Sequence, residues 1–198
     1  MSIAIVKYNA GNIRSVQFAL QRLGVDAIWT DDPEVLQAAD KVIFPGVGEA
    51  STAMRYLRER GLDNVLRGLR QPVLGICLGL QLFCRHSEEG DTSCLNIFDA
   101  RVRLFPPVSG GKKRKVPHIG WNTLTNMRGP LFDGVQESSF VYFVHSFYAE
   151  LHPETAACTE YGERFSAALQ HDNFFAVQFH PEKSGPVGQH ILNNFLNL

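Results

Sequence analysis

Residues 72–81 read Pro72-Val73-Leu74-Gly75-Ile76-Cys77-Leu78-Gly79-Leu80-Gln81, an apolar run that passes through Gly-x-Cys-x-Gly straight into a helical pattern. This arrangement predicts a nucleophile elbow, a tight strand-to-helix turn that projects a reactive side chain. Gly75 and Gly79 are required because side chains there would collide across the turn. The positive end of the following helix activates the thiol of Cys77, and the Leu78 amide is free to donate to an oxyanion. A buried, inert cysteine is the alternative interpretation.

Strand and helix patterns alternate on both sides of this elbow. In the first half we expect strands at 2–8, 25–29, 41–45 and 72–76, with helices at 13–23, after the Asp32-Pro33 cap, and at 49–60. Such βαβ units predict an α/β fold whose parallel sheet binds ligands at the carboxyl ends of its strands. The second half adds strands at 101–105, 118–124, 140–148, 165–170 and 174–179, and a final helix at 187–198. We expect one domain, residues 1–198.

A second motif supplies a candidate base. The apolar run Phe174-Phe175-Ala176-Val177-Gln178-Phe179 ends in His180-Pro181-Glu182. A thiol nucleophile needs an imidazole to take and return its proton and an acid to orient that imidazole. In an extended segment residues i and i+2 point to the same side, which predicts a hydrogen bond between His180 and Glu182. A histidine at a strand end is more often structural, so this motif indicates a catalytic base only in combination with the elbow at Cys77.

A third motif, Pro45-Gly46-Val47-Gly48, lies where the third expected strand ends. A glycine-rich turn at this place can direct backbone amides at a developing negative charge. Glycine turns after strands are common, so the motif is informative only as the neighbour of the elbow. In that setting Val47, Gly48 and Leu78 form the predicted oxyanion hole.

Composition and charge exclude several classes of protein. The 198 residues carry a net charge of −1, which gives no electrostatic case for binding nucleic acid or a membrane surface. The sequence begins with a strand pattern and not a signal peptide, and the four cysteines lack zinc-site spacing, so we expect a cytosolic protein with free thiols and no cofactor or metal. The basic segment 106–115 is interpreted as a solvated, mobile loop or as a contact for an acidic partner or a phosphate, and the role of residues 112–115 stays open.

Taken together, the elbow with Gln81, the glycine turn and His180-Pro181-Glu182 resemble the class I (triad) glutamine amidotransferases in order and spacing along the whole chain. The resemblance implies a three-layer fold, with a largely parallel central sheet flanked by helices and extended by antiparallel strands. It implies that Cys77 attacks the side-chain amide of glutamine to form a thioester, with His180 as proton carrier and Glu182 as its orienting acid. Gln81, Glu89 and the backbone near His145 and Ser146 would bind the amino-acid end of glutamine, although Glu89 can also be interpreted as a solvated loop acid.

Two further segments, Pro117-His118-Ile119-Gly120-Trp121-Asn122 and Tyr142-Phe143-Val144-His145-Ser146-Phe147-Tyr148, resemble the branch of that class that serves imidazole glycerol phosphate synthase in histidine biosynthesis. This resemblance implies that ammonia passes to a cyclase subunit with a (βα)8-barrel fold. The implied interface residues are Asn12, Pro117, His118, Trp121 and Lys183. Trp121 can equally be a core residue, Asn12 a helix cap and Lys183 a solvated lysine. Lys7 departs from the branch, where an acid is usual.

Three alternatives remain. The chain could be the glutaminase of another synthase, for pyridoxal phosphate, aminobenzoate or anthranilate, although residues 117–122 argue against these. It could be a stand-alone cysteine hydrolase, such as a peptidase or a γ-glutamyl hydrolase, which would be active without a partner. It could be a binding module without catalysis, which the presence of Cys77, His180 and Glu182 disfavours.

Overall fold

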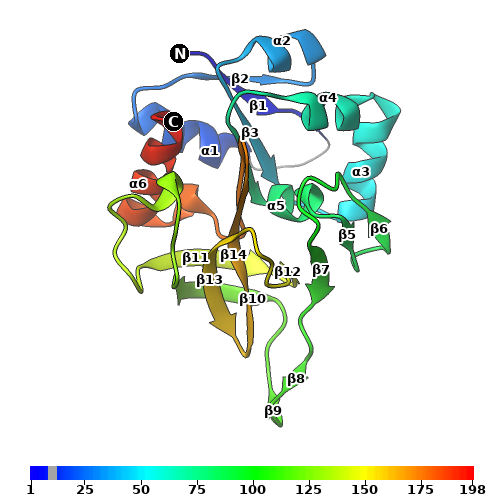
Figure 1. Ribbon diagram of the computed structural model, residues 1–198, viewed down its shortest axis with the longest axis vertical. Helices are drawn as coiled ribbons and strands as arrows, with labels where there is room; N and C mark the ends of the chain where they lie inside the picture. The colour runs from blue at the N-terminus through cyan, green and yellow to red at the C-terminus, as the bar shows by residue number, and fades with distance from the viewer. Residues whose placement is uncertain (9–12) are drawn as a thin grey trace.

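The computed structural model describes residues 1–8 and 13–198 and contains an eleven-stranded sheet that runs through the molecule (Figure 1). One half of this sheet is a parallel block in which neighbouring strands share their direction. In spatial order it contains β2 (Ala27–Thr30), β1 (Ile3–Val6), β3 (Lys41–Gly46), β4 (Val73–Cys77) and β15 (Phe174–Val177). The carboxyl ends of β3, β4 and β15 therefore lie side by side, which is where an α/β sheet binds its ligands.

The other half of the sheet continues from β15 with mainly antiparallel pairing. Its strands are β14 (Glu163–His171), β12 (Phe147–Ala149), β7 (Arg101–Leu104), β5 (His86–Ser87) and β6 (Thr92–Ser93), while β13 (Thr155–Tyr161) pairs with β14. Only β5 and β7 run parallel here. The predicted combination of a parallel sheet and added antiparallel strands is confirmed.

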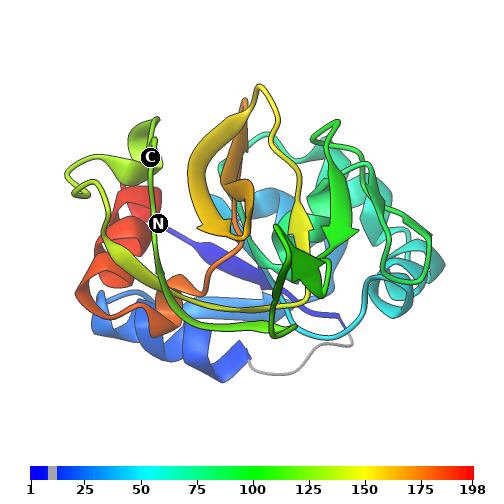
Figure 2. The same cartoon turned by 90° about the horizontal axis from the view of Figure 1, so that it is seen from below.

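Helices cover both faces of the parallel block, which gives three layers (Figure 2). Along β1, the side chains of Ile3 and Ile5 join one buried cluster and those of Ala4 and Val6 join another. This alternation is the two-residue period of a strand that is buried on both faces. The first cluster is completed by α1 (Ile13–Arg22) and α6 (Gly185–Leu196), and the second by α2 (Pro33–Ala38), α3 (Ala50–Glu59), α4 (Leu62–Gly68) and α5 (Leu78–Phe83).

One expected strand, residues 140–148, is in fact two. The chain forms β11 (Phe140–His145), breaks at Ser146 and resumes as β12. The reason is that the two strands belong to different sheets: β12 lies in the main sheet, whereas β11 pairs antiparallel with β10 (His118–Thr123) in a separate two-stranded sheet. The break places Ser146 at a corner of the chain beside the main sheet.

The basic segment 106–115 contains more order than the expected mobile loop. It forms a small hairpin of β8 (Val108–Ser109) and β9 (Lys112–Lys113), which projects from the body of the protein at the bottom of Figure 1. Gly110 and Gly111 make its turn with φ of +56° and +76°, the combination that a two-residue hairpin loop favours. Two 3-10 turns, η1 (Pro130–Phe132) and η2 (Pro181–Lys183), complete the elements.

Candidate active site

Cys77 occupies the junction between β4 and α5, as the elbow predicts. It is the last residue of β4, its φ of +55° and ψ of −106° are rare for a residue with a side chain, and α5 begins at the next residue. Such a backbone conformation costs on the order of 1–3 kcal/mol and persists only where the surrounding structure imposes it. The Sγ atom donates to the carbonyl of Val144 at 3.9 Å and accepts from Nε2 of Gln178 at 3.7 Å. The thiol is thereby held at the carboxyl end of the parallel block.

The requirement for glycine on both sides of Cys77 is confirmed. A Cβ atom on Gly79 would lie 2.1 Å from the carbonyl oxygen of Phe44 in β3, and one on Gly75 would lie 2.7 Å from the ring of Phe83. Both distances are far below an ordinary contact. The first residues of α5 thus lie directly against β3, and this contact holds the Leu78 amide next to the glycine turn.

His180 and Glu182 form the predicted pair. The Nδ1 atom of His180 donates to Oε1 of Glu182 at 2.8 Å, and the two side chains are 3% and 2% exposed. The expected reason was wrong, however, because Pro181–Lys183 forms a 3-10 turn and not an extended segment. The turn is fixed by Ser184, whose hydroxyl donates to the carbonyl of His180 at 2.6 Å.

The surroundings of His180 favour its charged form. Burial opposes protonation, but the neighbouring Cys77 thiol and Glu182 carboxylate outweigh burial and raise the pKa of His180 to about 10. Since Nδ1 is bound to Glu182, Nε2 is the nitrogen available for proton exchange. It is buried without a hydrogen-bond partner among the described residues. A protonated imidazole held in this way is suited to donate a proton to a leaving group.

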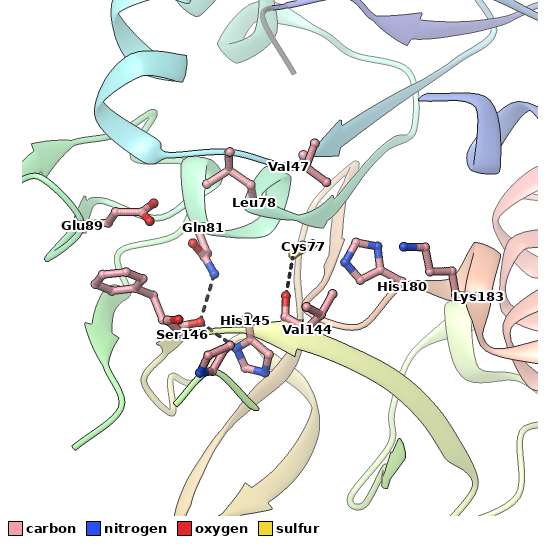
Figure 3. A pocket seen from close by; sticks show the side chains of 14 residues that line it. Val47, Cys77, Leu78, Gln81, Glu89, Val144, His145, Ser146, His180 and Lys183 are labelled. Carbon is pink, nitrogen blue, oxygen red and sulfur yellow. Dashed lines mark hydrogen bonds between the residues drawn. The ribbon is translucent and has the colours of Figure 1, made fainter. Parts of the chain in front are cut away.

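The glycine turn of β3 lies across the cavity from His145 and Ser146 (Figure 3). Gly48 has φ of +113°, a conformation that side chains rarely adopt. Beneath the turn lies Tyr8, to which the sequence interpretation gave no role. Its ring packs against Phe44 with a centroid distance of 5.2 Å, and its hydroxyl is buried with no partner of normal hydrogen-bond geometry among the described residues. Burial is the main cause that raises the pKa of Tyr8, the nearby Cys77 adds to this effect, and the Val47 amide opposes it.

One cavity of about 340 Å³ collects nearly all the predicted catalytic and substrate-binding residues (Figure 3). It is lined by Val47, Gly48, Cys77, Leu78, Gln81, Glu89, His145, Ser146 and His180 from that prediction. Glu182 lies behind His180 and reaches the cavity only through it. A volume of this size is within the range of small-molecule sites.

Glu89 is half-buried and not the solvated acid that the alternative interpretation proposed. Its carboxylate accepts from the amide of Ala50 at 2.8 Å, at the beginning of α3. Burial raises the pKa of Glu89, and this hydrogen bond opposes the effect. The carboxylate therefore connects the wall of the cavity to the helix that follows the glycine turn.

Gln81 and Gln178 form a polar link inside the cavity wall. The Nε2 atom of Gln81 donates to the carbonyl of Phe147 at 3.0 Å and to Oε1 of Gln178 at 3.2 Å. Gln178 is fully buried and contacts Cys77, yet the sequence interpretation passed over it. A single amide side chain in an otherwise apolar strand was the signal that could have identified it.

The residues expected at a partner interface differ in where they lie in the structure. Pro117 and Lys183 line the cavity, and Trp121 is 54% exposed, so it is not the core residue that the alternative proposed. The expectation for His118 is wrong as regards its side chain, which is 3% exposed and points into the protein. Asn12 lies outside the described residues.

Several remaining side chains have partners that the sequence did not suggest. Four histidines outside the cavity contact acidic groups or a carbonyl oxygen: His86 pairs with Asp91, His152 and His171 with Glu154, and His190 with the carbonyl of Asp133. Lys7, the departure from the branch pattern, lies 3.6 Å from Asp31 and over the ring of Trp29.

Among residues 1–8 and 13–198 there is no group of three or more side chains suited to hold a metal. Within the same residues, no helix is both long enough and apolar enough to cross a membrane.

Comparison with known proteins identifies the family that this chain resembles. The model of the family described as glutamine amidotransferase class-I matches residues 5–198. A protein of Bacteroides thetaiotaomicron described as imidazole glycerol phosphate synthase subunit HisH is 61% identical, with 100% of both chains covered. A protein of Idiomarina loihiensis with the same description is 48% identical, over 100% of this chain and 98% of the relative.

Solved structures share the fold at lower identity. A putative GMP synthase protein from Thermoplasma acidophilum superposes with a TM-score of 0.76 at 22% identity, covering 100% of this chain and 93% of that one. The structure of PurLQS from Thermotoga maritima gives a TM-score of 0.73 at 16% identity, covering 99% and 97%. These similarities extend over the whole three-layer arrangement.

Proposed function

The chain belongs to the glutamine amidotransferase class-I family, and we propose that it acts as the glutaminase subunit of an imidazole glycerol phosphate synthase in histidine biosynthesis. In this role it is a single domain, residues 1–198, that hydrolyses glutamine to glutamate and ammonia. The observation that carries the proposal is the meeting of Cys77 and His180 in one cavity, with Glu182 bound to the imidazole. The full-length similarity to HisH proteins supports the choice of synthase.

In the first half-reaction, the thiolate of Cys77 attacks the side-chain amide carbon of glutamine. The carbonyl oxygen becomes an oxyanion, which accepts hydrogen bonds from the Leu78 amide at the beginning of α5 and from the turn at Val47 and Gly48. His180 then gives its proton to the amide nitrogen, the C–N bond breaks, and ammonia leaves a γ-glutamyl thioester on Cys77. The raised pKa of His180 supports this role, because the imidazole is protonated when the thiolate forms.

In the second half-reaction, the neutral imidazole of His180 removes a proton from water. The resulting hydroxide adds to the thioester carbonyl, the same oxyanion hole stabilises the second tetrahedral intermediate, and glutamate departs as the Cys77 thiolate returns. Glu182 keeps the ring oriented in both steps and stabilises the imidazolium. No cofactor is needed for this sequence of steps.

The amino-acid end of glutamine binds on the side of the cavity opposite His180. There Glu89 offers a carboxylate to the ammonium group, and Gln81 and the backbone at His145 and Ser146 offer polar atoms (Figure 3). The hydrogen bond between Glu89 and the Ala50 amide supports this placement, since it fixes the carboxylate toward the cavity. This arrangement suits a ligand with a free α-amino group.

The ammonia is consumed by a cyclase subunit, for which we propose a (βα)8-barrel fold. Free ammonia in neutral water is mostly protonated and no longer nucleophilic, so the two subunits must enclose its path. The exposed side chains of Ile119, Trp121 and Phe140 on β10 and β11 form an apolar surface suited to docking, and Pro117 and Lys183 lie where that surface meets the cavity. The proposal includes a cytoplasmic location, which the four buried free thiols support.

An isolated subunit of this kind should be a poor glutaminase that the liganded partner activates. Gly48 has a positive φ and open space around its Cα, so this part of the turn can change conformation at small cost. A turn whose Val47 amide points away from the oxyanion lacks one donor, which is worth about 10²–10³ in rate. Docking of the cyclase beside Trp121 and Lys183 can favour the productive turn by differential contact.

The experiment measures glutamine hydrolysis by the free chain, by its complex with the cyclase subunit, and by the complex with the nucleotide ligand of the cyclase. We expect a rise of at least a hundredfold from the first to the third, and no hydrolysis by Cys77→Ser, whose partner affinity should be unchanged. The matched variants Cys84→Ala and Cys158→Ala should retain most of the activity. Equal rates in all three states would favour the stand-alone hydrolase instead.

A further inference from the structure

Two buried histidines that take no part in the proposed reaction connect β10 to the wall of the cavity. Nδ1 of His118 lies 3.0 Å from Nε2 of His145, and Nδ1 of His145 lies 2.7 Å from the carbonyl oxygen of Phe147. At the other end, Nδ2 of Asn122 lies 3.4 Å from Nε2 of His118. These contacts form an unbroken series from the small two-stranded sheet to the cavity.

The direction of each hydrogen bond follows from the chemistry of its ends. A carbonyl oxygen only accepts, so Nδ1 of His145 carries a proton and donates it to Phe147. Burial is the main cause that lowers the pKa of His145 to about 3 and that of His118 to about 4, so both rings are neutral and carry one N–H each. Nε2 of His145 therefore accepts from Nδ1–H of His118, whose Nε2 in turn accepts from the amide of Asn122.

Asn122 is itself fixed in the orientation that this direction requires. Its Nδ2 atom donates to the carbonyl of Glu160 at 2.9 Å, and its Oδ1 atom accepts from the amide of Thr123 at 2.8 Å. Nitrogen therefore faces His118. The ring of His118 is also held by stacking on Tyr161, with a centroid distance of 4.0 Å. Neither the Asn122 amide nor the His118 ring is therefore free to flip to the opposite orientation.

The series ends on an atom that the glutamine site also uses. The carbonyl of Phe147 accepts from Nδ1 of His145 and from Nε2 of Gln81. Gln81 reaches Cys77 through Gln178. A buried carbonyl that receives two donors is fixed in direction, and a shift of His145 would release the Gln81 amide as well.

We propose that His118 and His145 are positioning residues for glutamine, which hold the Phe147 carbonyl and, through it, the Gln81 side chain at the amino-acid end of the site. This inference rests on the proposed function and adds to it a reason why β10 carries an inward-facing histidine. A pair that only filled space would affect stability and leave the affinity for glutamine unchanged. Removal of the donor on His118 leaves Nε2 of His145 buried and unsatisfied, which loosens the wall.

The test compares His118→Leu with His118→Asn in the complex with the cyclase subunit and its ligand. Leucine removes the donor, whereas the amide nitrogen of asparagine, like Nδ1, is attached to Cγ and can still donate to His145. We expect His118→Leu to raise KM for glutamine about tenfold, with kcat within threefold of wild type. A buried polar group left without a hydrogen bond costs about 1.4 kcal/mol, which corresponds to a tenfold change in affinity. His118→Asn should restore most of the affinity.

A matched control is His190→Leu, which removes the bond from an exposed histidine to the carbonyl of Asp133 away from the cavity and should leave KM unchanged. A second readout is nitrogen NMR of the imidazoles in the wild-type chain, which should show neutral rings protonated at Nδ1 for both His118 and His145. This spectrum decides the matter also if His118→Leu fails to fold. Unchanged KM in folded His118→Leu, or a proton on Nε2 of either ring, would overturn the positioning role alone. A wild-type complex without glutaminase activity would instead overturn the proposed function and the inference together.

Discussion

Replacement of Gly79 by alanine tests whether the elbow depends on the close approach of α5 to β3. The added Cβ would lie 2.1 Å from the carbonyl oxygen of Phe44, whereas ordinary contacts begin at 3.4 Å, so helix and strand must separate by about 1.3 Å. The carbonyl oxygen that the new Cβ would meet belongs to the backbone of a central strand and cannot rotate aside. We expect strain of about 3 kcal/mol, the upper end for overpacking. Alanine in place of a helical glycine returns up to about 1 kcal/mol, which leaves a net loss of about 2 kcal/mol.

The assay is urea unfolding of the isolated chain followed by fluorescence, with Gly68→Ala as the matched control. Gly68 is also helical, at the end of α4, and a Cβ there meets nothing within 4 Å. The control should therefore be as stable as wild type or more stable by up to about 1 kcal/mol. Folded Gly79→Ala in the activated complex should also lose about a hundredfold in kcat, because it displaces the Leu78 amide, the proposed oxyanion donor. A Gly79→Ala variant as stable and as active as Gly68→Ala would refute the close-approach argument.

Three further predictions concern the proton carrier. His180→Asn should reduce the turnover of the activated complex by at least three orders of magnitude, about the loss of a triad member, and near-normal turnover would remove the triad from the proposal. Glu182→Gln removes a carboxylate that helps to raise the pKa of His180. The alkaline limit of kcat, near pH 10 in wild type, should therefore move to lower pH in this variant. A pH profile of kcat from pH 6 to 10.5 in which the limit does not move would contradict this. Gly188→Ala places a Cβ 2.0 Å from the carbonyl of Pro181, so it should displace the turn that holds Glu182. Although Gly188 does not line the cavity, we expect kcat to fall at least tenfold. Wild-type kinetics in the folded variant would show that the turn tolerates the shift.

The sequence was sufficient for features in which local pattern and tertiary structure agree. The elbow at Cys77 combines a buried strand, two glycines and a helix, and each part is detectable within ten residues. The N-cap at Asp32 is another example, since its side chain accepts from the amide of Glu34 as its position before Pro33 predicts. Both patterns can be recognised within a short stretch of sequence, although the contact of Gly79 with Phe44 helps to hold the elbow in place.

Features that depend on distant pairing were missed or explained incorrectly. The break at Ser146 arises because β11 and β12 join different sheets; the polar pair His145-Ser146 interrupts the apolar run at this place, but it does not reveal that the chain changes sheets. The pairing of His180 with Glu182 was expected from an extended segment, but it arises in a 3-10 turn held by Ser184. Ser184 in turn accepts from the amide of Tyr142 in β11, a partner 42 residues away.

The inward position of His118 shows how one strand can serve two functions. Along β10 the side chains alternate, so His118 and Asn122 face the protein while Ile119 and Trp121 face solvent at 60% and 54% exposure. The outer residues are those available to a partner, and the inner ones hold the carbonyl that fixes Gln81. Because the two sets share one backbone, a partner that shifts β10 on docking must also shift the histidine pair. If the cyclase docks on this strand as proposed, β10 would connect the partner to the proposed glutamine site, separately from the glycine turn on the opposite wall.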